Sequence, residues 1–174
     1  MRSQQVLGAL GLIGLMAVTA QVAAQSVASD QQLMSCPTRN GKHIDVTVQP
    51  GSPDVPGSFS YSFGVKGKKP ELSLSVPMSA GTVVPWPGIG QSVWSSVKFQ
   101  NGDYVYEAWH GFDRSDEDSE LEGGIRIIRN EEVIARYQCH GGYIAPLFLL
   151  EDAMAAAGYC WSFENSRWQQ NPCQ

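Results

Sequence analysis

The sequence predicts a mainly β fold: a small antiparallel β-barrel or sandwich of about seven strands, with one C-terminal α-helix and a disulfide-held tail. Between Lys42 and Cys139 apolar and polar residues alternate, which is typical of strands with one buried face. After Cys139 the alternation stops. The segment IAPLFLLEDAMAAAG places Pro146 and Gly158 where they favour the start and the end of a helix, so we expect a helix over residues 146–157.

The first residues of the chain have the features of a secretory signal peptide. Arg2 precedes an apolar run, Val6–Val18, of about 13 residues, which is too short to span a bilayer of ~30 Å as a helix. Val22 and Ala24 then supply the small residues that precede a cleavage site. We expect residues 1–24 to be removed.

The mature chain is long enough for one domain with its own hydrophobic core. It contains no second apolar run of membrane-spanning length, so no membrane span is predicted. We expect a periplasmic or secreted protein of a Gram-negative envelope. Its expected parts are a flexible mature N-terminus (25–35), an antiparallel β domain (36–143), and a C-terminal helix with a disulfide-closed tail packed on the same domain (144–174).

The first strands are predicted by three stretches before residue 80. HIDVTV, SFSYSFGV and ELSLSV each have one apolar face, and serines occupy most of the other face in the second and third. GKKP at Gly67–Pro70 suits a turn between the last two. The expected strands begin at His43, Ser58 and Glu71.

Two hairpins are predicted further along the chain. Asn101-Gly102 separates SSVKFQ from DYVYEAW, and an Asn-Gly pair readily adopts the positive φ angles of a two-residue turn. GIRIIR and EEVIARYQC flank Asn130 and form the second candidate hairpin. The segment Val84–Gly90 reads VPWPGIG, and its prolines and glycines predict a loop.

The chain contains four cysteines, Cys36, Cys139, Cys160 and Cys173. An even number in an exported protein predicts two disulfides, for which three pairings exist. We favour Cys36–Cys139, joining the start of the domain to the end of its last strand, and Cys160–Cys173, closing the tail. Zinc is not predicted, because no C-x-x-C motif occurs and only three histidines are present.

The chain is acidic, with a formal net charge of −5 and a pI of about 5.1, so nucleic acid is excluded as a partner. The stretch DRSDEDSELE, Asp113–Glu122, has six carboxylates and one arginine. Counted from Asp116 as an EF-hand loop, Leu121 takes the glycine position and Ile127 the glutamate position, so that motif fails. A solvated loop, a non-standard calcium site and a surface for a basic protein remain open.

No catalytic motif is found, and neither an enzyme nor a cofactor is predicted. GYCWSF at Gly158–Phe163 resembles the segment around the nucleophilic cysteine of papain-type proteases, but no histidine follows it. G-x-S-x-G and H-E-x-x-H are absent. We interpret His43, His110 and His140 as surface residues at strand ends, and keep His110, which precedes the acidic stretch, as a candidate binding residue.

Five tryptophans are a rich supply for a domain of this size. Trp86 lies between Pro85 and Pro87 in a predicted loop, and Trp109 ends a predicted strand. Tryptophans at such positions can anchor a protein partner or form a flat surface for a sugar.

The layout resembles that of periplasmic lysozyme inhibitors, which are small acidic-faced β-barrels, although the Ser-Gly-x-x-Tyr loop of that family is not present in the expected form. The resemblance implies a non-catalytic binding protein, an inhibitor or immunity factor for a basic, lysozyme-like enzyme. The alternative is a carbohydrate- or small-ligand-binding envelope module that uses exposed tryptophans. The candidate binding residues are Asp116, Glu117, Asp118, Glu120, Trp86, Trp109 and His110.

Overall fold

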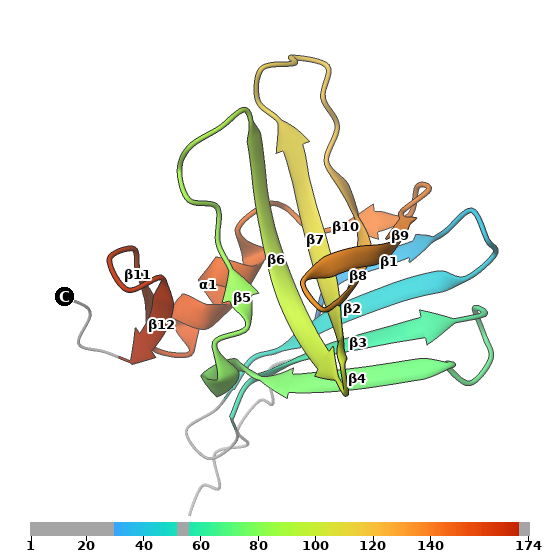
Figure 1. Ribbon diagram of the computed structural model, residues 1–174, viewed down its shortest axis with the longest axis horizontal. Coiled ribbons are helices and arrows are strands. Elements are labelled where there is room, and N and C mark those ends of the chain that lie inside the picture. The colour runs from blue at the N-terminus through green and yellow to red at the C-terminus, as the bar shows by residue number, and fades with distance from the viewer. Residues whose placement is uncertain (1–29, 52–55, 171–174) are drawn as a thin grey trace, which may run out of the picture.

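The structure is a computed structural model that describes residues 30–51 and 56–170. The predicted signal peptide and Cys173 lie outside these residues. The described chain forms two five-stranded antiparallel sheets, a two-stranded hairpin and one α-helix (Figure 1). Within this part of the chain no helix is long and apolar enough to cross a membrane.

The first sheet has the strand order β10-β1-β2-β3-β4. Ile44, Val46 and Val48 on one strand, and Phe59 and Tyr61 on the next, are at most 2% exposed. The alternating serines fall on the opposite face, because successive side chains of a strand point to opposite sides. The predicted alternation is therefore confirmed. The strands are β1 (Gln31–Pro37), β2 (His43–Gln49), β3 (Ser58–Gly64), β4 (Leu72–Pro77) and β10 (Tyr143–Ile144).

The second sheet has the strand order β5-β6-β7-β8-β9. Val97, Phe99, Ala108 and Ile125 are at most 1% exposed and join the apolar face of the first sheet in one hydrophobic cluster. Burial of these two faces is the main driving force for the arrangement. The strands are β5 (Val83–Val84), β6 (Ser92–Asn101), β7 (Tyr104–Asp113), β8 (Glu122–Arg129) and β9 (Glu132–Gln138).

The two sheets pack with their strands in steeply different directions, since β6 and β7 cross the strands of the first sheet (Figure 1). No described strand is hydrogen-bonded into both sheets, so they do not close on one another. The architecture is sandwich-like, and the barrel alternative is wrong. The described chain has twelve strands, more than the seven expected. Two of the five additional strands, β5 and β10, contain only two residues each and leave no periodic signal.

Strand β1 begins inside the segment that was expected to be flexible. Leu33 and Met34 are both buried although they are neighbours, because the register of β1 against β2 shifts between Gln32 and Met34. A bulge of this kind breaks strict alternation. The period of two was therefore not visible in QQLMSC.

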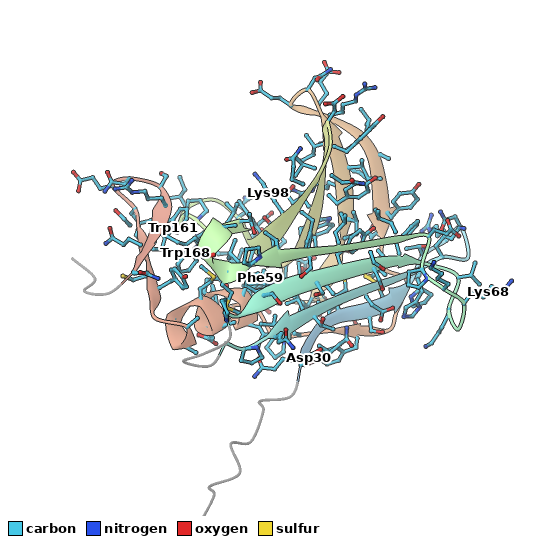
Figure 2. All side chains as sticks on the ribbon, turned by 90° about the horizontal axis from the view of Figure 1, so that it is seen from below. Asp30, Phe59, Lys68, Lys98, Trp161 and Trp168 are labelled. Carbon is cyan, nitrogen blue, oxygen red and sulfur yellow. A yellow bond between two sulfur atoms is a disulfide. The ribbon has the colours of Figure 1, made fainter. Side chains whose placement is uncertain are left out.

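The C-terminal part has one α-helix, α1 (Leu149–Ala156), within the range expected for it. The tail beyond it was expected to be irregular, but it forms a hairpin of β11 (Tyr159–Ser162) and β12 (Arg167–Gln170). Figure 2 shows Trp161 and Trp168 side by side in this hairpin, and their rings meet edge to face at 5.4 Å. The Nε1 of Trp168 donates to the carbonyl of Val83 at 2.8 Å, which fixes the hairpin against β5.

The predicted disulfide Cys36–Cys139 is present, with a Cα–Cα distance of 5.4 Å. It joins β1 of the first sheet to the residue that follows β9 of the second, so it links the sheets covalently. Of the second predicted pair, Cys160 is disulfide-bonded, and Cys173 lies outside the described residues.

Candidate functional site

The acidic stretch forms the connection between β7 and β8, at the top of Figure 1. Asp113 Oδ1 accepts hydrogen bonds from the backbone N–H of Ser115 at 2.9 Å and from its hydroxyl at 2.6 Å, and Ser119 Oγ accepts from the Asp113 N–H at 2.9 Å. Asp116 Oδ1 accepts from the Asp118 N–H at 3.1 Å. These contacts give the loop a defined course, as Asx turns do.

The carboxylates of this loop differ in their surroundings, and Glu122, at the start of β8, accepts a hydrogen bond from Gln138. Asp113 is used to shape the loop, and the donors of Ser115 lower the pKa of its carboxyl below the usual value, so it is ionised at neutral pH. The four predicted binding acids, Asp116, Glu117, Asp118 and Glu120, are exposed. Among the described residues no group of three histidine, cysteine, aspartate or glutamate side chains is placed to hold a metal ion.

A second loop, residues 85–91 between β5 and β6, is attached to the acidic loop. The Arg114 guanidinium lies 5.2 Å from the centre of the Trp86 ring, and the Arg114 N–H donates to the carbonyl of Gln91 at 3.0 Å. Trp86 Nε1 donates to the carbonyl of Ile89 at 2.9 Å, and Ile89 itself is 74% exposed. The predicted residue Trp86 is therefore joined to the predicted acids, beside an exposed apolar side chain that the sequence did not single out.

A cleft of about 360 Å³ lies next to these loops, over β6, β7 and β8. Trp109, another predicted residue, lines it together with Trp94 and Arg126. The two tryptophans lie on the outer face of the sheet. Val93 and His110 lie on its other face and point into the core. The remaining side chains that carry charge or hydroxyl groups at the cleft are Ser92, Asp113, Ser119 and Glu122.

Arg126 is held in place beside the cleft. Its Nη1 donates to Glu107 Oε2 at 3.1 Å, its guanidinium lies 5.0 Å from the centre of the Trp109 ring, and Glu107 Oε1 accepts from Ser96 Oγ at 2.9 Å. Ser96 is fully buried and Glu107 is 6% exposed. A buried charge of this kind requires a partner, and here the guanidinium supplies it.

His110 does not belong to this surface, and the expectation that it lies at the surface is wrong. The expectation is also wrong for His43, which is only 8% exposed. His110 is 0% exposed on the core face of β7, directly opposite Ser95 on β6. Burial lowers the pKa of its imidazole to about 4, so the ring is neutral at physiological pH. Its Nε2, Ser95 Oγ and both carboxylate oxygens of Glu151 on α1 are buried with no hydrogen-bond partner among the described residues.

Glu151 is the second buried ionisable group of this region. The nearby Ser95 hydroxyl acts to lower the pKa of its carboxyl, although the two groups do not reach the geometry of a hydrogen bond. Burial is the larger effect and raises that pKa. Ser95 and His110 are fully buried, so this polar group lies inside the fold.

One constellation with the residue types of a hydrolase went unnoticed in the sequence. Ser35 Oγ donates to Asp45 Oδ1 at 2.7 Å and lies 3.0 Å from His43 Nε2, which is 3.6 Å from the same carboxylate oxygen. In a catalytic triad the serine proton is directed at the histidine, and the carboxylate holds the other ring nitrogen. Here the serine proton is directed at the carboxylate, so the group is not arranged as a triad. The H-x-D spacing within one strand was the only available signal.

Fold and surface together define a disulfide-linked, sandwich-like antiparallel β protein with an acidic loop and an aromatic cleft at one end of its second sheet. Comparison with models of protein families, with curated proteins and with solved structures finds no match to this chain. The function is therefore argued from the residues themselves.

Proposed function

We propose that the protein is an exported, non-catalytic binding protein that acts as an inhibitor or immunity factor for a basic, lysozyme-like enzyme. The observation that carries the proposal is the attachment of the exposed acidic loop to the loop bearing Trp86 and Ile89, through Arg114. The two loops place a row of carboxylates next to an apolar side chain.

This combination has the anatomy of a protein interface. Interfaces have an apolar centre and a polar rim, and Ile89 with Trp86 supplies the first while the acids supply the second. The loop carries six carboxylates against one arginine, so a basic protein is attracted over several ångströms. Such charge mainly raises the rate of association and selects the partner, while the apolar contact contributes affinity.

The proposal assigns no catalytic role to the two histidine-containing groups described above. His110 is buried and neutral, and the Ser35 hydroxyl is directed at a carboxylate. The Cys36–Cys139 disulfide supports export, because disulfides persist in oxidising compartments such as the periplasm or the cell exterior.

The test is a titration of the protein with a basic lysozyme at low and high salt. We expect the affinity to fall about tenfold or more between roughly 0.05 M and 0.5 M salt, because exposed charges are screened over about one Debye length. Replacing Asp116, Glu117, Asp118 and Glu120 together by Asn or Gln is expected to weaken binding about tenfold or more at low salt.

A matched control removes the same charge elsewhere. Asp103, Glu131, Glu132 and Glu164 are also exposed acids, and their joint replacement by Asn or Gln changes the net charge equally. We expect this control to bind almost as tightly as the unchanged protein. Equal binding by the acidic-loop variant and the unchanged protein, or equal losses in both variants, would show that the loop is not the docking surface.

A further inference from the structure

The aromatic cleft over β6, β7 and β8 contains Trp94, Trp109 and Arg126, which have no role in the binding of a basic protein proposed above. Each of its tryptophans stands directly opposite a glycine on the neighbouring strand: Trp94 opposite Gly111, and Trp109 opposite Gly124. The glycine leaves the sheet surface open on that side of each indole, while Ser96 pairs with Trp109 on its other side and Arg126 lies over the Trp109 ring. Both tryptophans are only half-buried, so part of each ring is open to a ligand.

Packing requires both of these glycines. A Cβ at Gly111 would lie 2.6 Å from the carbonyl oxygen of Val93 and 2.8 Å from Trp94 Cβ, and one at Gly124 would collide with the carbonyl oxygen of Tyr137. The backbone approaches too closely there for any larger residue. The open sheet surface beside the indoles is thus built into the register of the strands.

The polar groups at the cleft are fixed and of two kinds. Arg126 is positioned by Glu107 and by the Trp109 ring, and a guanidinium has five N–H groups, so donors remain beyond the one that binds Glu107 Oε2. Asp113 and Glu122 line the same cleft and supply carboxylate acceptors, and Ser119 adds a hydroxyl. The ionised Asp113, whose carboxyl pKa is lowered by Ser115, supports this assignment.

We infer that the cleft binds a neutral pyranose ring of the gluco type, with its hydroxyl groups equatorial. Such a ring presents flat C–H faces, which pack on indoles, and a rim of hydroxyl groups, which match carboxylates and a guanidinium. The volume of about 360 Å³ is within the range of small-ligand sites and suits a short oligosaccharide.

Other ligand classes fit less well. A phosphate or an acidic sugar would be repelled by Asp113 and Glu122. A purely apolar ligand would cover Arg126 and the carboxylates without replacing their hydrogen bonds to water, which is costly. A neutral sugar satisfies both the indoles and the polar groups. The inference is tested independently of the acidic-loop proposal, since Ile89 and the four acids replaced in that test, Asp116, Glu117, Asp118 and Glu120, do not line the cleft.

The experiment is calorimetric titration with two trisaccharides, cellotriose and tri-N-acetylchitotriose, each up to about 10 mM. We expect at least one to bind with a Kd of roughly 0.1–1 mM, together with a change in tryptophan fluorescence. Trp94→Ala and Trp109→Ala are each expected to weaken binding about tenfold or more, while Trp109→Phe, which keeps an aromatic face, is expected to lose less than about threefold.

The control is Phe163→Ala, which removes an aromatic side chain that is 68% exposed at the tip of the tail hairpin, outside the cleft. It is expected to bind the trisaccharide as the unchanged protein does, and melting temperatures establish that each variant is folded. Binding of neither trisaccharide, full binding by folded Trp109→Ala, or an equal loss in Phe163→Ala would overturn the inference.

Discussion

His110 lies on the core face of β7, and two environmental effects act on its imidazole. Loss of hydration lowers its pKa, and the contact of Nδ1 with the carbonyl of Ala145 at 3.4 Å acts in the opposite direction but is the smaller effect. The resulting pKa of about 4 lies well below the value of about 6.5 for an exposed histidine. His110 is therefore protonated at a lower pH in the folded protein than in the unfolded chain.

The stability of the protein is expected to fall as the pH falls from about 6.5 to about 4. Over this window the unfolded state binds more protons at His110 than the folded state does, so acid favours unfolding. The full effect is about 3 kcal/mol by linkage, and is complete only near pH 4. Urea unfolding across this pH range measures it.

The buried carboxyl of Glu151 acts in the opposite direction, because its raised pKa lets the folded state take up a proton earlier than the unfolded state. A comparison of the unchanged protein with His110→Asn isolates the histidine, since Glu151 is present in both. The difference in stability between the two proteins should depend on pH over this window. A constant difference would contradict the assignment.

The placement of His110 was predictable in principle from the parity of its strand. In YEAWHGF, the charged Glu107 marks the outer face, so Trp109 shares that face and His110 points inward. A histidine is usually expected at the surface, but the alternation of inward and outward residues along the strand is the better guide to the position of His110. Alternation also indicates that Trp109 lies on the outer face. Only the pairing of β6 with β7 shows that Trp94 shares this face and is paired with Gly111.

The turns between strands show how tertiary pairing selects turn conformation. The hairpin predicted at Asn101-Gly102 exists, but Asn101 pairs with Tyr104, so the two turn residues are Gly102 and Asp103. Gly102 has a φ of +58°, as the first residue of a type II′ turn requires. The β8–β9 hairpin has a turn with two positive φ values instead, at Asn130 and Glu131, with φ of +49° and +65°.

Glu131→Gly is expected to stabilise the protein by about 0.5–1 kcal/mol. A non-glycine residue in the left-handed region costs about 1 kcal/mol, and part of the gain is offset because glycine is more flexible in the unfolded chain. Since the new pair is Asn-Gly, it also suits a type I′ turn. Thermal unfolding should show a rise in Tm of about 2 °C.

Glu131→Gln is the control for this turn, because it removes the charge and keeps the strained backbone. It is expected to leave Tm unchanged within about 1 °C. An equal rise in Tm for both variants would mean that charge repulsion, for example with Glu132, is responsible and that backbone conformation is not.

At the scale of the whole molecule, the two sheets share one hydrophobic core, and Cys36–Cys139 connects them at a sequence separation of 103 residues. A disulfide that closes a long loop reduces the conformational entropy of the unfolded chain. Replacing both cysteines by serine is expected to lower the free energy of unfolding by roughly 4–5 kcal/mol, measured by urea denaturation. A loss below about 1 kcal/mol would show that the link contributes little through loop entropy.

Charge is also separated across the whole molecule. The acidic loop lies between β7 and β8, whereas Lys66 and Lys68 lie at the tip of the β3–β4 hairpin, where Figure 2 shows Lys68. The two segments occupy different ends of the fold (Figure 1). A basic partner is thus attracted to one end and repelled from the other, which orients the encounter.

The sequence by itself determined the antiparallel β class, the helix and the main hairpins, because these depend on alternation and turn residues, whereas the Cys36–Cys139 pairing was only the favoured one of the three that four cysteines allow. The tertiary structure decided that the sheets stay open, that His110 is buried, and that Trp94, Trp109 and Arg126 meet in one cleft. The physical reason is that local patterns determine which face of a strand is apolar, whereas pairing register and sheet packing determine which distant residues share that face.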